Sequence, residues 1–515
     1  MIFTHQSPLS GVIAPAKWPL TPSFPHIRMA PRFQDIIEEA RLSARALLDY
    51  GEGFFHPTVR LGVTGLSRAG KTVFITALIH GLTKGGRFPV FEPYASGRIA
   101  QARLAPQPDD AVPRFDYENH VTTLIEQRRW PNSTVDISEL RLVIDYQRQN
   151  GADSTLTLDI VDYPGEWLLD LPLLNKSYEQ WSAESLALSR EPLRAKLASP
   201  WHEHLTTLDA AGRENEQATR VAAKLFTDYL RACRDERFAM SLLPPGRFLM
   251  PGNLADTPAL TFAPLDVSAD GTAPDGSLWA MMARRYEAYK DVVVRPFFRD
   301  HFARLDRQIV LVDALAAFNA GPEALHDLEA ALAGILDCFR IGQRTLFSNL
   351  FRPRIDRILF AATKADHLHH SSHDRLEAVL RRAVAKAAER AEYAGATIDI
   401  VALAAVRATR EAMVARGRDK LPSLLGTPAP GEVANGDTFD GETEVATFPG
   451  DLPDDPEELF KGTFRGLSSA AADKADYRFL RFRPPRLERE GDAEPALPHI
   501  RLDRAFQFLI GDRLL

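Results

Sequence analysis

The chain has 515 residues, of which 45% are hydrophobic and 25% are charged, and its formal net charge is −7. These proportions are typical of a globular protein with a large apolar core, and they exclude a chain that is disordered throughout. The slight acidic excess argues against a protein that mainly coats nucleic acid. Two cysteines cannot form a disulfide framework or a four-cysteine zinc site.

The N-terminal segment shows neither a signal peptide nor a membrane span. No apolar run approaches the roughly 20 residues that a membrane-spanning helix needs. We therefore expect a cytoplasmic protein and leave open a peripheral contact with the inner face of a membrane. Residues 1–32 carry six prolines and no acidic residue, which predicts a disordered tail. Residues 33–48 have apolar side chains at helical spacing, which predicts an amphipathic helix packed on the next domain.

The first predicted strand is Val59–Thr64, a short buried segment that leads into a glycine-containing loop. Two alternating segments, 138–147 and 154–161, flank Asn150-Gly151, which is a hairpin turn signal. Residues 171–300 have a helical pattern rich in aromatic residues. We expect these aromatic side chains to form the segment's own core rather than a platform for nucleic acid.

Beyond residue 300, short apolar runs alternate with helical patterns. The expected strands are 308–315, 355–362 and 397–404, and the expected helices are 323–339 and 374–394. This alternation predicts an α/β fold with a mostly parallel sheet covered by helices on both faces.

The C-terminal part begins with a strongly acidic stretch. Between Leu421 and Phe460 there are ten acidic residues and no basic ones, together with several glycines and prolines. We therefore expect residues 421–475 to be a mobile acidic insertion without regular structure. An alternating strand at 477–482 and a final helix at 504–515 are expected to pack on the main domain.

The strongest motif is Gly65-Leu-Ser-Arg-Ala-Gly-Lys-Thr72, which matches G-x-x-x-x-G-K-[ST] between a strand and a helix. Its glycines let the backbone wrap around phosphates, and the helix N-terminus adds partial positive charge. Lys71 is expected to reach the β- and γ-phosphates, and the Thr72 hydroxyl to bind Mg²⁺. The predicted phosphate-binding residues are Gly65, Ser67, Arg68, Ala69, Gly70, Lys71, Thr72 and Val73.

A second motif, Asp162-Tyr-Pro-Gly165, directly follows the apolar end of the 154–161 strand. An aspartate at a strand end can hold Mg²⁺ through water, and a glycine three residues later can donate its N–H to the γ-phosphate. We therefore predict Asp162 as a metal-site residue and Gly165 as a phosphate contact.

The third motif, Thr363-Lys-Ala-Asp366, follows the 355–362 strand. The Asp366 carboxylate can accept two hydrogen bonds from the N1–H and N2–H₂ edge of guanine, a pair of donors that adenine does not offer there. The aliphatic stem of Lys364 can lie along the base while its ammonium stays solvated. The alternative is an ordinary strand-to-helix turn in which Asp366 caps the helix.

In this order the three motifs resemble those of the small P-loop GTPases. Longer phrases resemble the YcjX-like family, a bacterial family of Ras-like GTP-binding proteins linked to stress responses. These phrases are Val63–Thr72, Asp162–Trp167, Thr363–Asp366, Val406–Thr409, Phe448–Asp451 and Pro498–Arg501. The similarity extends from about residue 33 to the C-terminus.

The resemblance implies a Ras-like G domain of the P-loop NTPase fold that binds GTP or GDP with Mg²⁺. It implies a first part of this domain at 33–170 and a second part at 301–420. These parts are separated by a helical insertion at 171–300. The acidic insertion at 421–475 and a C-terminal strand and helix at 476–515 follow.

Further roles carry over from the resemblance with less support from the residues themselves. Thr134 precedes the 138–147 strand and is the expected switch threonine that ligates Mg²⁺, whereas Thr122 and Thr123 fall in a helical pattern. The base-stacking loop is expected at Ala405-Val406-Arg407, where only backbone contacts carry over.

The expected hydrolytic residues are unusual. Glu166 stands where many G proteins place the water-orienting glutamine, and an acid there repels the γ-phosphate, so we expect slow hydrolysis. Lys71, Arg68 and Gly165 are the catalytic candidates. Arg68 could stabilise the transition state as an arginine finger supplied in cis. Alternatively, it points into solvent or pairs with an acidic residue of the insertion.

Four histidines, His367, His369, His370 and His373, follow the guanine-reading motif. His369 and His373 have the spacing of zinc ligands on a helix. A polar loop at the start of a helix is the other interpretation.

These observations predict a GTP- and GDP-binding conformational switch with slow Mg²⁺-dependent hydrolysis and an unidentified protein partner. One alternative is a non-hydrolysing nucleotide-bound scaffold whose insertion binds a membrane or a protein. Another is a P-loop small-molecule kinase, which would need an acceptor pocket and an arginine-rich lid but not Thr363–Asp366.

Overall fold

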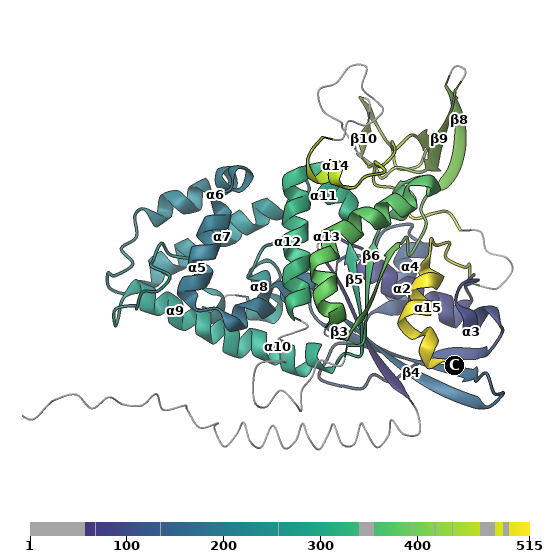
Figure 1. Cartoon of the computed structure of the whole chain (residues 1–515), viewed down its shortest axis with the longest axis horizontal. Helices are drawn as coiled ribbons and strands as arrows, with labels where there is room; N and C mark the ends of the chain where they lie inside the picture. The colour runs from purple at the N-terminus through teal and green to yellow at the C-terminus, as the bar shows by residue number, and fades with distance from the viewer. Residues whose placement is uncertain are drawn as a thin grey trace, which may run out of the picture. The chain divides into compact units, whose positions relative to one another are not determined.

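The computed structural model describes residues 57–338, 355–463, 479–487 and 494–515, apart from positions 67, 134, 256, 394, 417, 418 and 435 (Figure 1). These residues belong to one compact unit. The tail and helix expected over residues 1–48 lie outside the described ranges. None of the helices in these ranges combines the length and apolarity needed to cross a bilayer.

A seven-stranded sheet in the order β2-β3-β4-β1-β5-β6-β7 forms the centre of the fold. Its strands are β1 (Thr58–Gly65), β2 (Ile99–Ala105), β3 (Ser138–Gln147), β4 (Asp153–Asp162), β5 (Arg307–Val312), β6 (Arg357–Ala362) and β7 (Thr397–Ala402). Strands β4, β1, β5, β6 and β7 are mutually parallel, and the β3 pairings with β2 and β4 are antiparallel. The mostly parallel sheet is therefore confirmed.

The central strands are buried on both faces, which explains their continuous apolar runs. In β5 every residue is buried. Ile309 and Leu311 belong to one core cluster, and Val310 and Val312 belong to the other, because successive side chains point to opposite faces.

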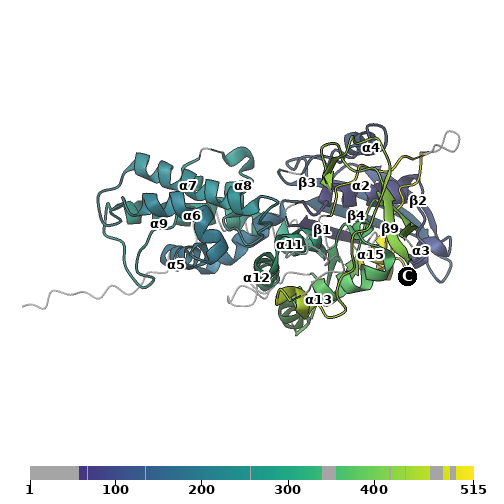
Figure 2. The ribbon, with the colours of Figure 1, turned by 90° about the horizontal axis from the view of Figure 1, so that it is seen from above.

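Helices cover both faces of the sheet. One face packs against α2 (Lys71–Lys84), α4 (Tyr117–Ile125) and α15 (Leu502–Ile510), and the other against α11 (Ala314–Ala320), α12 (Pro322–Cys338) and α13 (His373–Tyr393). In Figure 2, α2 and α4 lie above the strands, and α12 and α13 lie below them.

The predicted strands and hairpin around Asn150-Gly151 are confirmed, with two differences. The run predicted as a strand at 308–315 ends at Val312, because the Asp313 side chain accepts a hydrogen bond from the Ala316 N–H (3.1 Å) and begins α11. Strand β2, an edge strand that is mostly solvent-accessible and whose apolar positions are largely alanine, was not identified from the sequence.

Residues 171–300 are helical, as predicted. Their helices are α5 (Tyr178–Ser189), α6 (Pro192–Leu205), α7 (Glu216–Arg234), α8 (Gly246–Leu249), α9 (Leu278–Tyr289), the π-helix η4 (Lys290–Val294) and α10 (Arg295–Asp300). Short 3₁₀ turns occur at η1 (Gly165–Asn175), η2 (Gly252–Leu254), η3 (Pro258–Leu260) and η5 (Phe302–Arg304).

The aromatic residues of this segment form its own core, as expected. Trp181 and Trp201 are fully buried, and Trp181 stacks on Tyr286 with ring centroids 5.1 Å apart. Phe226 contacts both tryptophans. The assignment of 171–300 as an insertion, and the other domain boundaries, remain predictions.

Part of the acidic segment has regular structure, which corrects the expectation of a loop throughout. Strands β8 (Arg410–Arg416), β9 (Asp419–Gly426) and β12 (Val445–Thr447) form an antiparallel sheet in the order β12-β9-β8. The same stretch also contains a short hairpin, β10 (Val433–Ala434) and β11 (Asp437–Thr438), and the helix α14 (Glu457–Phe460). The acidic residues lie mostly between these elements, so their charge does not prevent strand formation.

The prediction of a strand at 477–482 is wrong for residues 479–482, the part of it that the structure describes. Residues 479–482 contain no strand, and Phe482 makes only an isolated bridge to Pro428. The hydrogen bonds stop after Ala429 N–Arg481 O (2.6 Å) and Arg483 N–Thr427 O (2.8 Å). Prolines at 428 and 430 remove backbone donors there, so the ladder cannot continue. The final helix is confirmed as α15, followed by η9 (Gly511–Arg513), and the remaining short helices are α3 (Glu92–Ala95), η7 (Ala365–His367) and η8 (His370–Ser372).

Candidate functional site

The loop between β1 and α2 has the shape of a phosphate cradle. Arg68 and Gly70 have positive φ values of 61° and 81°, so the backbone reverses sharply before the helix. Lys71 is the first residue of α2, and its Nζ donates to the Gly65 carbonyl oxygen (3.3 Å). The lysine ammonium thus lies over the loop. Ser67 is outside the described residues.

The N-terminus of α2 has the features of an anion-binding site. Its N-cap, Gly70, makes no side-chain capping bond, and the first turn contains no acidic residue. The first N–H groups of a helix lack partners within the helix and carry the positive end of its dipole. Phosphate oxygens can satisfy these donors.

Asp162 and Gly165 lie against this loop. Strand β4 pairs with β1 so that Asp162 is opposite Val63, and Asp162 is buried. A Cβ atom placed on Gly165 would be 2.2 Å from the Gly65 carbonyl oxygen. Only glycine therefore lets the backbone after β4 approach the phosphate loop this closely.

The segment before β3 contacts the start of α2. The Thr72 hydroxyl donates to the Asn132 carbonyl oxygen (3.3 Å). Asn132 is two residues before Thr134, the predicted switch threonine, which itself lies outside the described residues. Thr122 and Thr123 are in α4, in line with the helical pattern that made them the weaker candidates.

The guanine-reading motif lies at the end of β6. Lys364 has a φ of 60° and forms an ion pair with Asp313, so its ammonium is paired rather than solvated. Asp366 is 4% exposed, and its Oδ2 accepts a hydrogen bond from the Ala408 N–H (2.9 Å). Its Oδ1 has no hydrogen-bond partner among the described residues and is available to a ligand.

The loop after β7 contacts this motif through the two residues that follow the predicted base loop. Ala408 and Thr409 contact Asp366, and the Thr409 hydroxyl donates to the Asp366 carbonyl oxygen (2.5 Å). By contrast, Val406 is buried in the core, and the Arg407 N–H donates to the Pro498 carbonyl oxygen (2.6 Å). The base loop predicted at 405–407 therefore lies in contact with the 498–501 phrase, and the residues after it face Asp366.

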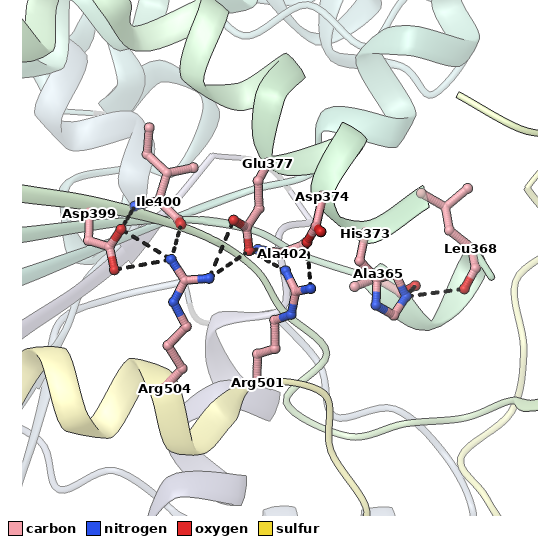
Figure 3. Close-up of polar contacts among 10 residues, drawn as sticks. All are labelled: Ala365, Leu368, His373, Asp374, Glu377, Asp399, Ile400, Ala402, Arg501 and Arg504. Carbon is pink, nitrogen blue, oxygen red and sulfur yellow. Dashed lines mark hydrogen bonds and ion pairs between the residues drawn. The ribbon is translucent and has the colours of Figure 1, made fainter. Parts of the chain in front are cut away.

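A buried histidine forms hydrogen bonds with the backbone of the guanine-reading motif and of the turn that follows it. His373, the first residue of α13, places Nε2 at 2.9 Å from the Ala365 carbonyl oxygen and 3.3 Å from that of Leu368 (Figure 3). Burial lowers the pKa of His373, so its ring is neutral near pH 7 and Nε2–H donates to both carbonyls. His373 is thus part of the fold of this turn and does not face His369.

Two arginines of the C-terminal segment tie α15 to α13 and β7. Arg501 pairs with Asp374 (2.7 Å) and Glu377, and Arg504 pairs with Glu377 (3.1 Å) and Asp399 (3.3 Å), as Figure 3 shows. Glu377 also accepts a hydrogen bond from the N–H of Ala402 (3.0 Å), the last residue of β7.

The helical segment contacts the phosphate side of the site through ion pairs at the end of α7. Arg234 pairs with Glu166 (3.3 Å), and Glu236 pairs with Arg68 (2.5 Å). Glu166 is buried, whereas the Arg68 and Glu236 side chains are each about half exposed. Sequence reasoning did not identify Arg234 or Glu236, since charged residues at a helix end carry no distinguishing signal. It did foresee an acidic partner for Arg68 as one alternative.

The turn that follows Glu166 is anchored in the same helical segment. The Asp170 carboxylate accepts hydrogen bonds from the Gly246 N–H (2.7 Å) and the Tyr289 hydroxyl (2.6 Å). Burial raises the pKa of Asp170 to about 7. A movement of η1 would therefore disturb the hydrogen bonds that Asp170 accepts from α8 and α9.

These contacts define two halves of the candidate site. The phosphate half comprises Gly65–Thr72 and Asp162–Glu166, at the ends of β1 and β4. The base half comprises Thr363–Asp366 with Ala408 and Thr409, at the ends of β6 and β7. Because parallel strands end at the same edge of the sheet, the fold brings these motifs to one edge, where ligands of such sheets bind.

Comparisons with known proteins agree with this arrangement. The family model described as "YcjX-like family, DUF463" matches residues 59–514. A protein of Escherichia coli strain K12 named Ras-like GTPase YcjX is 36% identical over 472 residues, covering 88% of this chain and 96% of its own length. A protein of Shewanella oneidensis with the same name is 33% identical over 483 residues, covering 88% and 94%.

Proposed function

This chain belongs to the YcjX-like family, and from that membership and the geometry above we propose that it binds GTP and GDP and acts as a nucleotide-dependent switch. The observation that carries the proposal is the convergence of a phosphate cradle and a buried carboxylate at one edge of the sheet. The cradle would hold the phosphates, and Asp366 would select guanine. The family resemblance adds a role in stress responses.

The chain also offers oxygen atoms suited to Mg²⁺. The Thr72 hydroxyl at the start of α2 and the buried carboxylate of Asp162 at the adjacent strand end are hard oxygen donors, the type that Mg²⁺ prefers. The Thr72–Asn132 hydrogen bond supports a third ligand from the segment that contains Thr134. When bound with nucleotide, the ion would neutralise charge on the phosphates.

We further propose that hydrolysis is slow. Glu166 occupies the position expected for a water-orienting glutamine, yet it is buried and paired with Arg234. The ion pair offsets the repulsion that a free carboxylate would exert on the γ-phosphate. It also removes Glu166 from direct interaction with water. This contact gives specific support to the second candidate, a scaffold that holds nucleotide without hydrolysing it.

Binding competition and one substitution test the guanine preference. GTP should displace a fluorescent GDP analogue far more effectively than ATP. Asp366→Asn should lower GDP affinity by about ten- to a hundred-fold, because a hydrogen bond to a charged acceptor contributes about 1.5–3 kcal/mol. The same variant should gain affinity for xanthine nucleotides, and its amide oxygen can still accept the Ala408 N–H.

Equal affinity of the wild type for GTP and ATP would refute the role of Asp366 and favour the kinase alternative. Single-turnover hydrolysis then separates the switch from the scaffold. A measurable rate that depends on Mg²⁺ supports the switch, and complete retention of bound GTP supports the scaffold.

A further inference from the structure

Three potential metal ligands come together beside the base half, in a combination that the sequence spacing did not indicate. They are His369 and His370, which follow η7, and Glu411, the second residue of β8. One ligand atom from each lies within 4.8 Å of the other two. His370 Nδ1 is 2.7 Å and His369 Nε2 is 3.8 Å from Glu411 Oε2.

These separations suit a zinc ion. Zinc binds histidine nitrogens and carboxylate oxygens at about 2.0–2.2 Å, which places neighbouring ligands of a tetrahedral site roughly 3.3–3.5 Å apart. The two distances to Glu411 Oε2 lie on either side of that value, so small side-chain rotations suffice. The His370 side chain is 67% exposed, which leaves a path for the ion and an open position for water.

Two of the three ligands also have a neighbour that can orient them, as metal ligands in proteins usually do. His369 Nδ1 is 2.9 Å from the Ser371 hydroxyl and accepts a hydrogen bond from the Ser371 N–H (3.4 Å), so Ser371 holds the ring with Nε2 directed toward Glu411. Glu411 Oε1 accepts from the His370 N–H (3.2 Å) and lies 3.5 Å from Arg407 Nη2, which leaves Oε2 for the ion.

We propose that His369, His370 and Glu411 form a Zn²⁺ site. His373, the residue expected to pair with His369, is excluded from this site because its ring is buried against two backbone carbonyls.

The position of the site gives it a consequence for nucleotide binding, which rests on the proposed function. His369 follows Asp366 by three residues, and Glu411 follows Thr409 by two. Thr409 itself contacts the Asp366 carbonyl oxygen. A bound zinc ion would therefore cross-link the two segments that form the base half. We expect it to slow the release of GDP.

The first experiment measures the metal alone. Full-length protein without an affinity tag is treated with EDTA, transferred to buffer with excess Mg²⁺, and titrated with Co²⁺ in the absence of nucleotide. The expected result is one equivalent of Co²⁺ with the intense visible absorption of tetrahedral coordination, which Zn²⁺ abolishes by displacement.

Substitutions localise the ion. His370→Ala and Glu411→Gln should lose this absorption, and Ser371→Ala should weaken Co²⁺ binding by about tenfold or more. His326→Ala and Glu444→Gln are matched controls. His326 is a half-exposed histidine beside a single glutamate, and Glu444 pairs with Arg410, and neither should alter the titration. Circular dichroism confirms that each variant is folded.

Absence of the absorption in the wild type, or an unchanged titration in Glu411→Gln, would overturn the zinc site. A second measurement tests the coupling by following the release of a fluorescent GDP analogue with and without Zn²⁺. Slower release in the wild type but not in Glu411→Gln supports it, and equal rates refute it. Because the Co²⁺ titration needs no nucleotide, a failure of GDP binding would refute the proposed function while the metal site is still decided.

Discussion

The two halves of the candidate site are held in different ways. The base half rests on buried hydrogen bonds, from Ala408 to Asp366 and from His373 to two carbonyls, with the arginines of the C-terminal segment behind it. The phosphate half depends on a close backbone approach at Gly165 and on ion pairs from a separate helical segment. Buried hydrogen bonds fix one geometry, whereas the half-exposed Arg68–Glu236 pair can be exchanged at little cost. We therefore expect the base half to hold a bound nucleotide in one geometry and the phosphate half to change when nucleotide binds.

The largest effect on GTP affinity is expected from adding a methyl group where the phosphate loop and the turn after β4 are in close contact. Gly165→Ala places a methyl group 2.2 Å from the Gly65 carbonyl oxygen, so one of the two backbones must move. We expect a cost of about 3 kcal/mol or more, a loss of GTP affinity of roughly a hundred-fold. Isothermal titration with GTP measures it. Gly334→Ala in α12, where no described atom beyond its chain neighbours and the helix's own backbone lies within 4 Å of the added methyl, is the control and should bind normally. Normal GTP binding by Gly165→Ala would show that the contact is dispensable.

The next largest effect is expected from removing the positive charge of Lys71, which lies over the phosphate cradle. Lys71→Ala should weaken GTP binding by about ten- to a hundred-fold, because a charge-assisted hydrogen bond contributes about 1.5–3 kcal/mol. Its thermal stability should be unchanged, since Lys71 Nζ contacts only a loop carbonyl among the described residues. Lys84→Ala at the other end of α2, where Lys84 pairs with Glu494, is the matched control. Equal GTP affinities of the two variants would remove Lys71 from the site.

A substitution of His373, which packs against the base half, tests the comparison by its effect on the free energy of unfolding. His373→Ala removes the side-chain donor of the Ala365 and Leu368 carbonyls, of which Ala365 keeps the Leu368 N–H (3.1 Å), so the free energy of unfolding should fall by about 1–3 kcal/mol. Burial holds the pKa of His373 below its ordinary value of 6.5. Below about pH 6.5 the unfolded chain therefore binds a proton that the folded ring does not, and the wild type should lose stability as the pH falls.

Denaturant unfolding between pH 8 and pH 5 measures this dependence, which should be weaker in His373→Ala. His326→Ala, with a half-exposed ring, is the control and should lower the free energy of unfolding less than His373→Ala does. An identical pH profile in wild type and His373→Ala would show that the ring titrates as it does in the unfolded chain.

The smallest effect is expected at the exposed pair on the phosphate side. Arg68 and Glu236 are each about half exposed, so their ion pair contributes about 0.2–1 kcal/mol and is screened by salt. Glu236→Gln should change GDP affinity less than about fivefold. If Arg68 also acts on the γ-phosphate, Glu236→Gln should raise the hydrolysis rate and Arg68→Ala should lower it. Unchanged rates in both variants would limit Arg68 to the ion pair.

The sheet and the motif positions were predictable because they depend on local signals. The apolar run of β5, the alternation in β3 and the Asn150-Gly151 turn each identify an element from neighbouring residues alone. The edge strand β2 has only a weak signal, since its apolar face is Ala100, Ala102 and Leu104, of which only Ala102 is buried. In the acidic segment, net charge indicated a loop, but pairing with the 410–416 strand determined the structure of β9.

The predicted site residues were placed together by strand topology, whereas their partners across the fold were not predictable. That Asp366 would contact Ala408 rather than Ala405 depends on pairing between residues 404–407 and the 498–500 segment, almost a hundred residues later. Likewise, the Glu166–Arg234 contact depends on how the helical segment packs, which no local pattern records. The proposed zinc site was unpredictable for the same reason. The sequence spacing indicated His369 and His373 as ligands, whereas the proposed site contains Glu411, which lies in β8 and is brought near by the fold.

The contacts of Arg501 and Arg504 have a consequence for synthesis of the chain. Both arginines brace α13 and β7 behind the base half, yet they are made about 140 residues after Asp366. At a translation rate of about 5–20 residues per second, the guanine-reading turn waits on the order of ten seconds for its support. The phosphate loop has been made much earlier. A nascent chain released before residue 504 would therefore carry a complete phosphate cradle beside an unsupported base pocket, and we expect it to lack the proposed preference for guanine.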